Sequence, residues 1–277
     1  MTLKKQNKQH KYKSMKNKNK DIMYILFADI KGYSANKKNL DLLAEIEDLL
    51  YGFGESYFND TKNNCFKVLG DGMLATNYDI KTMAESALKI IETFKTKEKN
   101  GDFEHFTEKP QIRIALHLGK KEKITERRLK DNALKDVAGE PIIETARIEP
   151  IVMPNEVFCS QYFANALEFF NAENIEATKL GNFELGKTHD SFKIDLCVLH
   201  AKDENKDVEN FKEHIESKLV DKNKTYNEEA TDLCKMSFLE CGLPTFTQQA
   251  NVKVEGNEND TFVNIQGSTI NTNRNKK

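Results

Sequence analysis

The stretch IMYILFADI, residues 22–30, is apolar at every position except Asp29. This run is about half as long as the ~20 residues of a membrane span, so it predicts a buried strand instead. A carboxylate at the mouth of an apolar strand is unfavourable unless a cation or hydrogen-bond donors meet it. Asp29 is therefore either a ligand for a cation or the cap of a following helix.

A second carboxylate lies in the stretch CFKVLGDGMLATN, residues 65–77. This pattern predicts two strands joined by a tight Gly-Asp-Gly turn, with Asp71 in the turn. Two carboxylates from neighbouring strands are what a pair of magnesium ions requires when the ions bridge triphosphate oxygens. The sequence thus predicts a metal site at Asp29 and Asp71.

Strand and helix patterns alternate over the rest of this region. A charged loop is expected between the strand at 111–119 and the next helix. Hydrophobic periodicity predicts helices at 39–58, 82–94 and 142–151, and strands at 111–119 and 192–199. This alternation indicates an α/β (α+β) sandwich.

Composition divides the chain into three parts. Residues 1–20 carry eight lysines and no acidic residue, which predicts a basic disordered tail, with weak binding of nucleic acid or an anionic surface as the alternative. Residues 21–200 form the predicted folded domain. Residues 201–277 are strongly charged and predict a linker or solvated helix, a short helix at 228–243 and a β-hairpin over 250–272.

Neither the cysteines nor the net charge indicates a secreted or membrane protein. The five cysteines are scattered, without a C-x-x-C pair or a Cys/His cluster at zinc spacing, and the formal net charge is −2. No apolar run is long enough to span a membrane. The cytoplasm is the expected location.

The stretch GNFELGKT, from Gly181 to Thr188, fits the P-loop pattern G-x-x-x-x-G-K-[ST]. A functional P-loop follows a strand and opens a helix, whose N-terminal amides hold the phosphates. The residues after Lys187 alternate like a strand, and the inner positions are large. The match therefore predicts a turn between strands, from which Lys187 could still reach a phosphate.

Four segments together resemble the class III nucleotidyl cyclases, the family of adenylate and guanylate cyclase catalytic domains. They are FADIKGYS, FKVLGDGMLA, RIALHLGK and DVAGEPIIETARIEP, in the family's order and at about its spacing. The resemblance covers roughly residues 21–200. It implies a ferredoxin-like core in which helices flank an antiparallel sheet.

The resemblance implies a role for individual residues. Asp29 and Asp71, with the backbone carbonyl of Ile30, match the ligands of two divalent cations, Mn²⁺ or Mg²⁺. The two aspartates would act in attack of the ribose 3′-oxygen on the α-phosphorus, with pyrophosphate as the leaving group.

The same resemblance assigns the substrate-binding residues. Lys67 matches a lysine that reads the base, and Asp136 matches its acidic partner. Arg147 matches the arginine that stabilises the transition state, and Lys187 matches a lysine on the triphosphate. In the family, the metal-binding aspartates of a site come from one subunit, and the base-reading residues and the arginine come from the other. A single chain that carries both sets therefore implies a homodimer.

One position departs from the purine cyclases. Ile143 stands where an asparagine commonly orients the ribose. Glu140 or Glu144 could take over that role. This departure affects the choice of purine as substrate more than it affects cyclase chemistry.

The base itself stays open from the residues alone. Lys67 can donate to a carbonyl or ring nitrogen, and Asp136 can accept from an amino group or from the N3 hydrogen of uracil. Phe66 and Tyr57 could narrow the pocket for a single ring, or they could be ordinary core aromatics.

The architecture resembles the pyrimidine cyclases of bacterial anti-phage Pycsar systems, in which a C-terminal segment is a sensor module. This implies UTP, with CTP second, as substrate, and a cyclic pyrimidine monophosphate that activates a separate effector. A phage-derived activator is a further implied partner. The alternatives are a purine cyclase in ordinary signalling and an inactive nucleotide-sensing module. A diguanylate cyclase is disfavoured, because the hairpin carries LGDGM instead of a G-G-[DE]-E-F turn.

Overall fold

The computed structural model describes residues 21–36, 38–186, 191–220, 262–265 and 268–271. The chain separates into two compact units, Met1–Cys234 and Lys235–Lys277. In the second unit the described part is an antiparallel pair, β10 (Phe262–Ile265) and β11 (Ser268–Asn271). The predicted basic tail and the predicted helix at 228–243 lie outside the described residues. The predicted C-terminal hairpin is present, but its strands flank residues 266–267 and not the Asn/Gly-rich segment 255–260.

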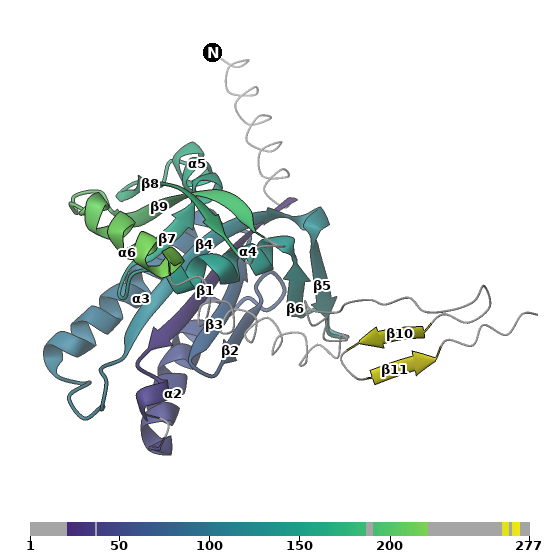
Figure 1. The fold of residues 1–277 in the computed structure, drawn as a ribbon, viewed down its shortest axis with the longest axis horizontal. Coiled ribbons are helices and arrows are strands. Elements are labelled where there is room, and N and C mark those ends of the chain that lie inside the picture. The colour runs from purple at the N-terminus through teal and green to yellow at the C-terminus, as the bar shows by residue number, and fades with distance from the viewer. Residues whose placement is uncertain (1–20, 37, 187–190, 221–261, 266–267, 272–277) are drawn as a thin grey trace, which may run out of the picture. The chain divides into compact units, whose positions relative to one another are not determined.

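A seven-stranded sheet forms the centre of the first unit, in the order β2-β3-β1-β4-β7-β9-β8 (Figure 1). All neighbouring pairs are antiparallel except β4 with β7, which is parallel. A separate hairpin pairs β5 with β6. The strands are β1 (Ile22–Lys31), β2 (Phe66–Leu69), β3 (Gly72–Asn77), β4 (Gln111–Lys120), β5 (Ile124–Arg128), β6 (Leu134–Gly139), β7 (Val157–Ser160), β8 (Ile175–Leu185) and β9 (Phe192–Ala201).

Helices cover both faces of the sheet, which explains why β1 is apolar from Ile22 to Ala28. Alternate residues of β1, such as Leu26, pack with α2, α3 and α5, while Ile25 and its neighbours of the same parity pack against α4 and the β5–β6 hairpin. The helices are α2 (Leu40–Tyr57), α3 (Ile80–Asn100), α4 (Glu140–Ile148), α5 (Gln161–Phe169) and α6 (Val208–Val220), and the short 3₁₀ turns are η2 (Ser34–Asn36), η3 (Lys121–Lys123) and η4 (Glu149–Ile151). The predicted α+β fold is confirmed.

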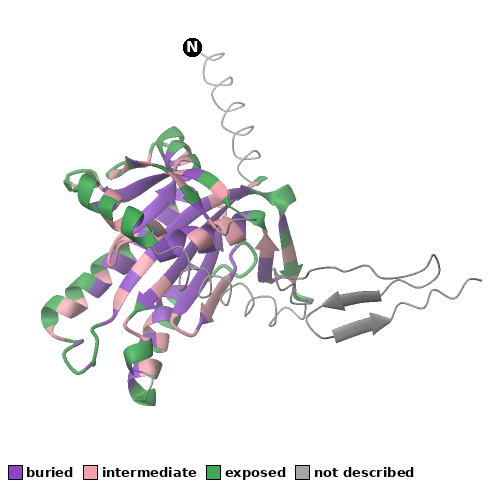
Figure 2. Ribbon diagram, in the orientation of Figure 1, coloured by how far each residue is buried: buried purple, intermediate pink, exposed green. Residues whose placement is uncertain are grey.

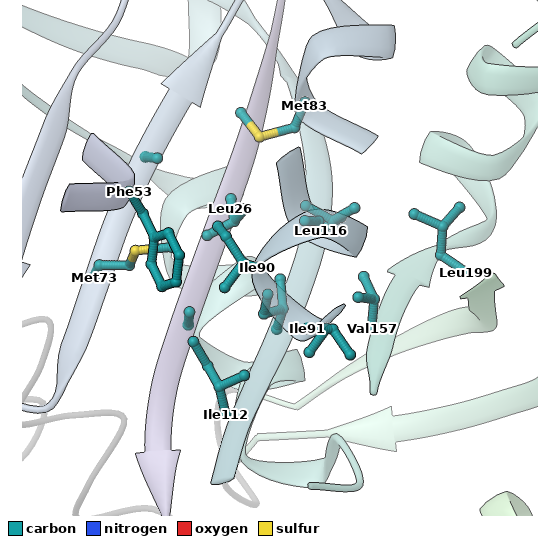
Figure 3. Packing of buried hydrophobic residues seen from close by; sticks show 14 of the residues in the cluster. Leu26, Phe53, Met73, Met83, Ile90, Ile91, Ile112, Leu116, Val157 and Leu199 are labelled. Atoms are coloured by element: carbon teal, nitrogen blue, oxygen red, sulfur yellow. The ribbon is translucent and has the colours of Figure 1, made fainter. Parts of the chain in front are cut away.

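The main core lies between the sheet and the α2, α3 and α5 layer. In Figure 3, Ile90 of α3 lies by Leu26 of β1 and Ile91 lies by Val157 of β7, within one buried cluster. Figure 2 shows the same division along the chain, with buried central strands and exposed outer faces on the helices. This core holds β1, β3 and β4 side by side. It therefore also determines which side chains lie close together at the ends of these strands.

Several elements were not predicted. The charged loop contains the β5–β6 hairpin, and the segment between α4 and β9 contains β7, α5 and β8. The predicted solvated helix exists as α6, yet Phe211 and Ile215 of α6 are buried in a cluster with η4 and the β8–β9 strands. No helix among the described residues has the length and apolar character to cross a membrane.

Candidate functional site

The turn between β2 and β3 brings the two predicted metal ligands together. Asp29 lies opposite Gly72 in the β1–β3 ladder, and the backbone N–H of Ile30 donates to the carbonyl oxygen of Asp71 at 3.0 Å. Gly70, the first residue of the turn, has φ of +68°, a conformation in which glycine carries no steric cost. The glycine-bounded turn therefore places Asp71 beside the end of β1. That the carbonyl of Ile30 is also a metal ligand remains a prediction.

Tyr33 lies within electrostatic reach of Asp71. Its hydroxyl donates to Glu47 at 3.1 Å. Burial, this hydrogen bond and the negative charges of Glu47 and Asp71 together raise the pKa of Tyr33 to about 12. The ring therefore stays protonated at neutral pH and adds no negative charge beside Asp71.

Arg113 is a site residue that the sequence analysis missed. It lies directly opposite Asp29 in the β1–β4 ladder, and its Nη2 donates to Asp29 Oδ2. Its Nε is 3.0 Å from Oε1 of Glu149, and its Nη1 donates to the carbonyl oxygen of Pro150 at 3.4 Å. A signal was present in the sequence, because Arg113 is the charged residue inside the otherwise apolar strand pattern QIRIAL. Asp29 thus meets a cation, as its position at a buried strand end requires.

The carboxylates fit divalent cations whose coordination is completed by a substrate. Among the residues that the structure describes, no three His, Cys, Asp or Glu side chains gather as a complete metal site. Magnesium commonly binds through one or two protein carboxylates together with substrate phosphates. Asp29 and Asp71 provide that number of carboxylates and leave the remaining positions to phosphate oxygens or water.

Lys67 and Asp136 form a buried ion pair. Lys67 Nζ is 2.6 Å from Asp136 Oδ1, and the two side chains are 12% and 2% exposed. Oδ1 also accepts the backbone N–H of Val137 at 2.9 Å. Asp136 Oδ2 is buried without a hydrogen-bond partner within the described part of the chain. A buried acceptor of this kind is costly unless a donor reaches it.

The β5–β6 hairpin delivers Asp136 to Lys67. Asp136 lies in β6 opposite Arg127, and β6 ends at Gly139, which has φ of +146°. A Cβ atom at Gly139 would lie 2.1 Å from the carbonyl oxygen of Lys123, so only glycine fits at this junction with α4. The hairpin that was not predicted is therefore the element that positions a predicted residue.

Arg147 lies in the last turn of α4, half-buried, with its guanidinium carbon 6.0 Å from the centre of the Phe192 ring. Ile143 precedes it by one helical turn, so both residues are on the same side of the helix. Glu140 binds Lys123 at 2.6 Å, and Glu144 binds His117 at 3.0 Å. Both glutamates proposed to replace the missing asparagine therefore already have partners.

The glycine-rich match is not a P-loop. Gly181 to Leu185 belong to β8 and pair with β9, and the described residues that follow, from Phe192, form a strand and not a helix. Lys187 lies outside the described residues, and its assignment to the triphosphate stays a prediction.

The two aromatic residues near the hairpin are part of the core. Phe66 stacks on Phe58 at 5.9 Å between ring centres and lies against Gly54, where a Cβ atom would be 2.1 Å from the Phe66 ring. Tyr57 stacks on Phe53 at 6.3 Å. Their packing accounts for these residues without a role in base recognition.

Solved structures similar to this chain include nucleotide cyclase domains. An adenylyl cyclase of P. aeruginosa, CyaB, superposes with a TM-score of 0.51 at 15% identity, over 67% of this chain and 96% of that chain. An adenylate cyclase of Trypanosoma brucei gives 0.53 at 16% identity, over 68% and 92%. The guanylyl cyclase Cya2 gives 0.50 at 12% identity, over 68% and 96%. No family model matches the sequence, and no curated protein matches it. The chain therefore has the fold of the class III cyclase domains, which confirms that part of the resemblance.

Proposed function

We propose that this protein is a nucleotidyl cyclase that converts a nucleoside triphosphate to the 3′,5′-cyclic monophosphate and pyrophosphate. The observation that carries the proposal is the juxtaposition of Asp29 and Asp71, at the end of β1, on a sheet with the cyclase fold. The Lys67–Asp136 pair adds a second polar group, in which Asp136 Oδ2 lacks a hydrogen-bond donor among the described residues.

The residues would divide the chemistry between them. Asp29 and Asp71, with the Ile30 carbonyl, would hold two divalent cations, which lower the pKa of the 3′-hydroxyl and neutralise phosphate charge when bound. Arg147 would stabilise charge on the transferring phosphoryl group, and Lys187 would contact the triphosphate. A positioned arginine in phosphoryl transfer contributes ~10³ to 10⁵ in rate.

Lys67 and Asp136 would select the base. Asp136 Oδ2 is an acceptor that lacks a donor among the described residues, and a base with an N–H group supplies one. We propose a pyrimidine, with UTP ahead of CTP, which rests on the resemblance to the Pycsar cyclases. The product would then serve in anti-phage defence in the cytoplasm by activating a separate effector, and a phage component would activate the enzyme.

A homodimer follows from the division of the site between subunits in this family. Asp29 and Asp71 of one subunit would face Asp136 and Arg147 of the other, across a two-fold axis. The second candidate function is a purine cyclase, adenylate or guanylate, and the adenylyl and guanylyl cyclases that are similar in structure favour it.

The test is product analysis. The purified full-length protein is incubated with ATP, GTP, CTP or UTP and Mn²⁺, and products are identified by mass spectrometry. We expect cyclic UMP as the main product, and no product from an Asp71→Ala variant with unchanged circular dichroism. An Asp60→Ala variant is the matched control, because Asp60 is an exposed aspartate that lies before β2.

The outcomes separate the levels of the proposal. Cyclic AMP or cyclic GMP would replace the pyrimidine assignment and keep the cyclase. Full turnover by the Asp71→Ala variant would refute the metal assignment. Absence of any product under all conditions would favour a nucleotide-sensing module.

A further inference from the structure

The ion pair on Asp29 belongs to a group of three charged residues. Arg113 donates to Asp29 from one side and lies 3.0 Å from Glu149 on the other. The side chains of Arg113, Asp29 and Glu149 are 12%, 13% and 6% exposed. A single guanidinium thus contacts two carboxylates where little water reaches them.

Asp29 and Glu149 share a counter-ion, because the guanidinium of Arg113 contacts both carboxylates. If Asp29 binds a divalent cation, as proposed above, that cation and Arg113 compete for the same carboxylate. Glu149 stays in contact with Arg113 in either case, because Glu149 approaches Nε while Asp29 approaches Nη2.

We propose that Arg113 is a positioning residue that holds Asp29 as an exchangeable counter-ion, and that Glu149 sets how readily Arg113 releases it. Before metal binds, Arg113 keeps the Asp29 carboxylate neutralised and oriented. After metal binds, Glu149 keeps Arg113 neutralised. This inference rests on the proposed function, since it takes Asp29 as a metal ligand.

The proposal predicts that substitutions of Arg113 and of Glu149 change the affinity for Mn²⁺ in opposite directions. Arg113→Met removes the competing cation, so the Kd for Mn²⁺ should fall by about tenfold. Glu149→Gln removes one negative charge from Arg113, which then holds Asp29 more tightly, so the Kd should rise by about tenfold. Both variants should lower the Tm of the metal-free protein, because each breaks a buried charged group.

The experiment measures Mn²⁺ binding to the nucleotide-free, full-length protein by electron paramagnetic resonance of the free ion. The Tm in EDTA is measured by circular dichroism. If Arg113→Met does not fold, Arg113→Gln removes the same charge and keeps a donor for Asp29. The matched controls are Arg128→Met and Glu126→Gln, because that pair lies on β5 with Nη2 and Oε2 2.8 Å apart. The controls should leave the Kd for Mn²⁺ unchanged.

Opposite shifts in Kd would support the inference. If both variants shift the Kd in the same direction, or lower the Tm without changing the Kd, the group is structural and the inference is overturned. An Asp29→Asn variant separates the two levels of inference. If Asp29→Asn binds Mn²⁺ as tightly as the unmodified protein, the metal assignment itself fails, whatever Arg113 does.

Discussion

The Lys67–Asp136 pair and the Asp29–Arg113–Glu149 group are both buried and charged, but they differ in the kind of ligand that each could bind. In the pair, one ammonium contacts one carboxylate, and Asp136 Oδ2 lacks a hydrogen-bond donor among the described residues. In the group, two carboxylates share the guanidinium of Arg113. A buried acceptor favours a ligand with an N–H group, whereas a carboxylate that shares its counter-ion can exchange it for another cation.

The largest expected effect tests whether Asp29 and Arg147 complete one site from opposite subunits; Arg147 lies on α4, directly after the strand β6 that carries Asp136. We expect Asp29→Ala and Arg147→Ala chains to be inactive separately, since each loses a part worth ~10³-fold or more. Mixed in equal amounts, they should recover about a quarter of the unmodified activity, because half of the dimers are mixed and each mixed dimer has one complete site. Activity is measured after the chains exchange, with dimers confirmed by light scattering.

Two controls make the mixing experiment decisive. Asp29→Ala mixed with Asp71→Ala should stay inactive, because both changes fall in the same half of each site. If the Asp29→Ala and Arg147→Ala mixture also stays inactive although mixed dimers form, the residues act within one chain. The two regions would then belong to a single-subunit site.

An intermediate effect measures the cost of breaking the neutral pair. Asp136→Ala removes the carboxylate 2.6 Å from the buried Lys67 ammonium, so the free energy of unfolding should fall by about 3–5 kcal/mol. The double variant Lys67→Met/Asp136→Leu should recover much of this loss, because apolar residues can replace a buried pair. Urea unfolding provides the measurement.

The exposed pair Lys179–Asp195 is the control for this experiment. Its atoms are 3.1 Å apart and its side chains are 60% and 40% exposed, so Asp195→Ala should cost less than about 1 kcal/mol. An Asp136→Ala variant as stable as Asp195→Ala would show that the buried pair has no special energetic role.

The sequence predicted the parts of the fold that carry a strong local pattern. β1 and α2 have unbroken apolar runs or a regular helical period, and the β2–β3 turn has its glycines, so each was located within a few residues. The β5–β6 hairpin was missed because its strands alternate charged residues with few apolar ones, and tertiary contacts, not local pattern, make it a hairpin. β7, with four buried residues, is too short to give a period.

The candidate site was predictable where a motif names the residue, and less so where only geometry does. Asp29, Asp71, Lys67 and Asp136 were identified from sequence, and the structure brings each pair together. Arg113 and Glu149 were missed, because their importance depends on a ladder register that places Arg113 opposite Asp29. No local pattern contains that register.

The smallest expected effect concerns the buried ring nitrogen of a histidine on α6. His214 of α6 has a buried Nε2 atom that lacks a hydrogen-bond partner in the described ranges. Burial lowers the pKa of His214 below 6.5, and the positive charges of Lys218, Arg113 and Lys31 lower it further, while a backbone contact with Val152 opposes them. As the pH falls below 6.5, the unfolded chain takes up this proton before the folded chain does, so stability is lost.

His214→Asn should therefore lose less stability between pH 7.5 and pH 5.5 than the unmodified protein, in urea unfolding at both pH values. The effect should be small, because water screens a half-exposed ring. His105→Asn, which changes an exposed histidine beside Glu45, is the control. If His214→Asn and the unmodified protein lose equal stability, burial does not keep this ring neutral in the folded protein.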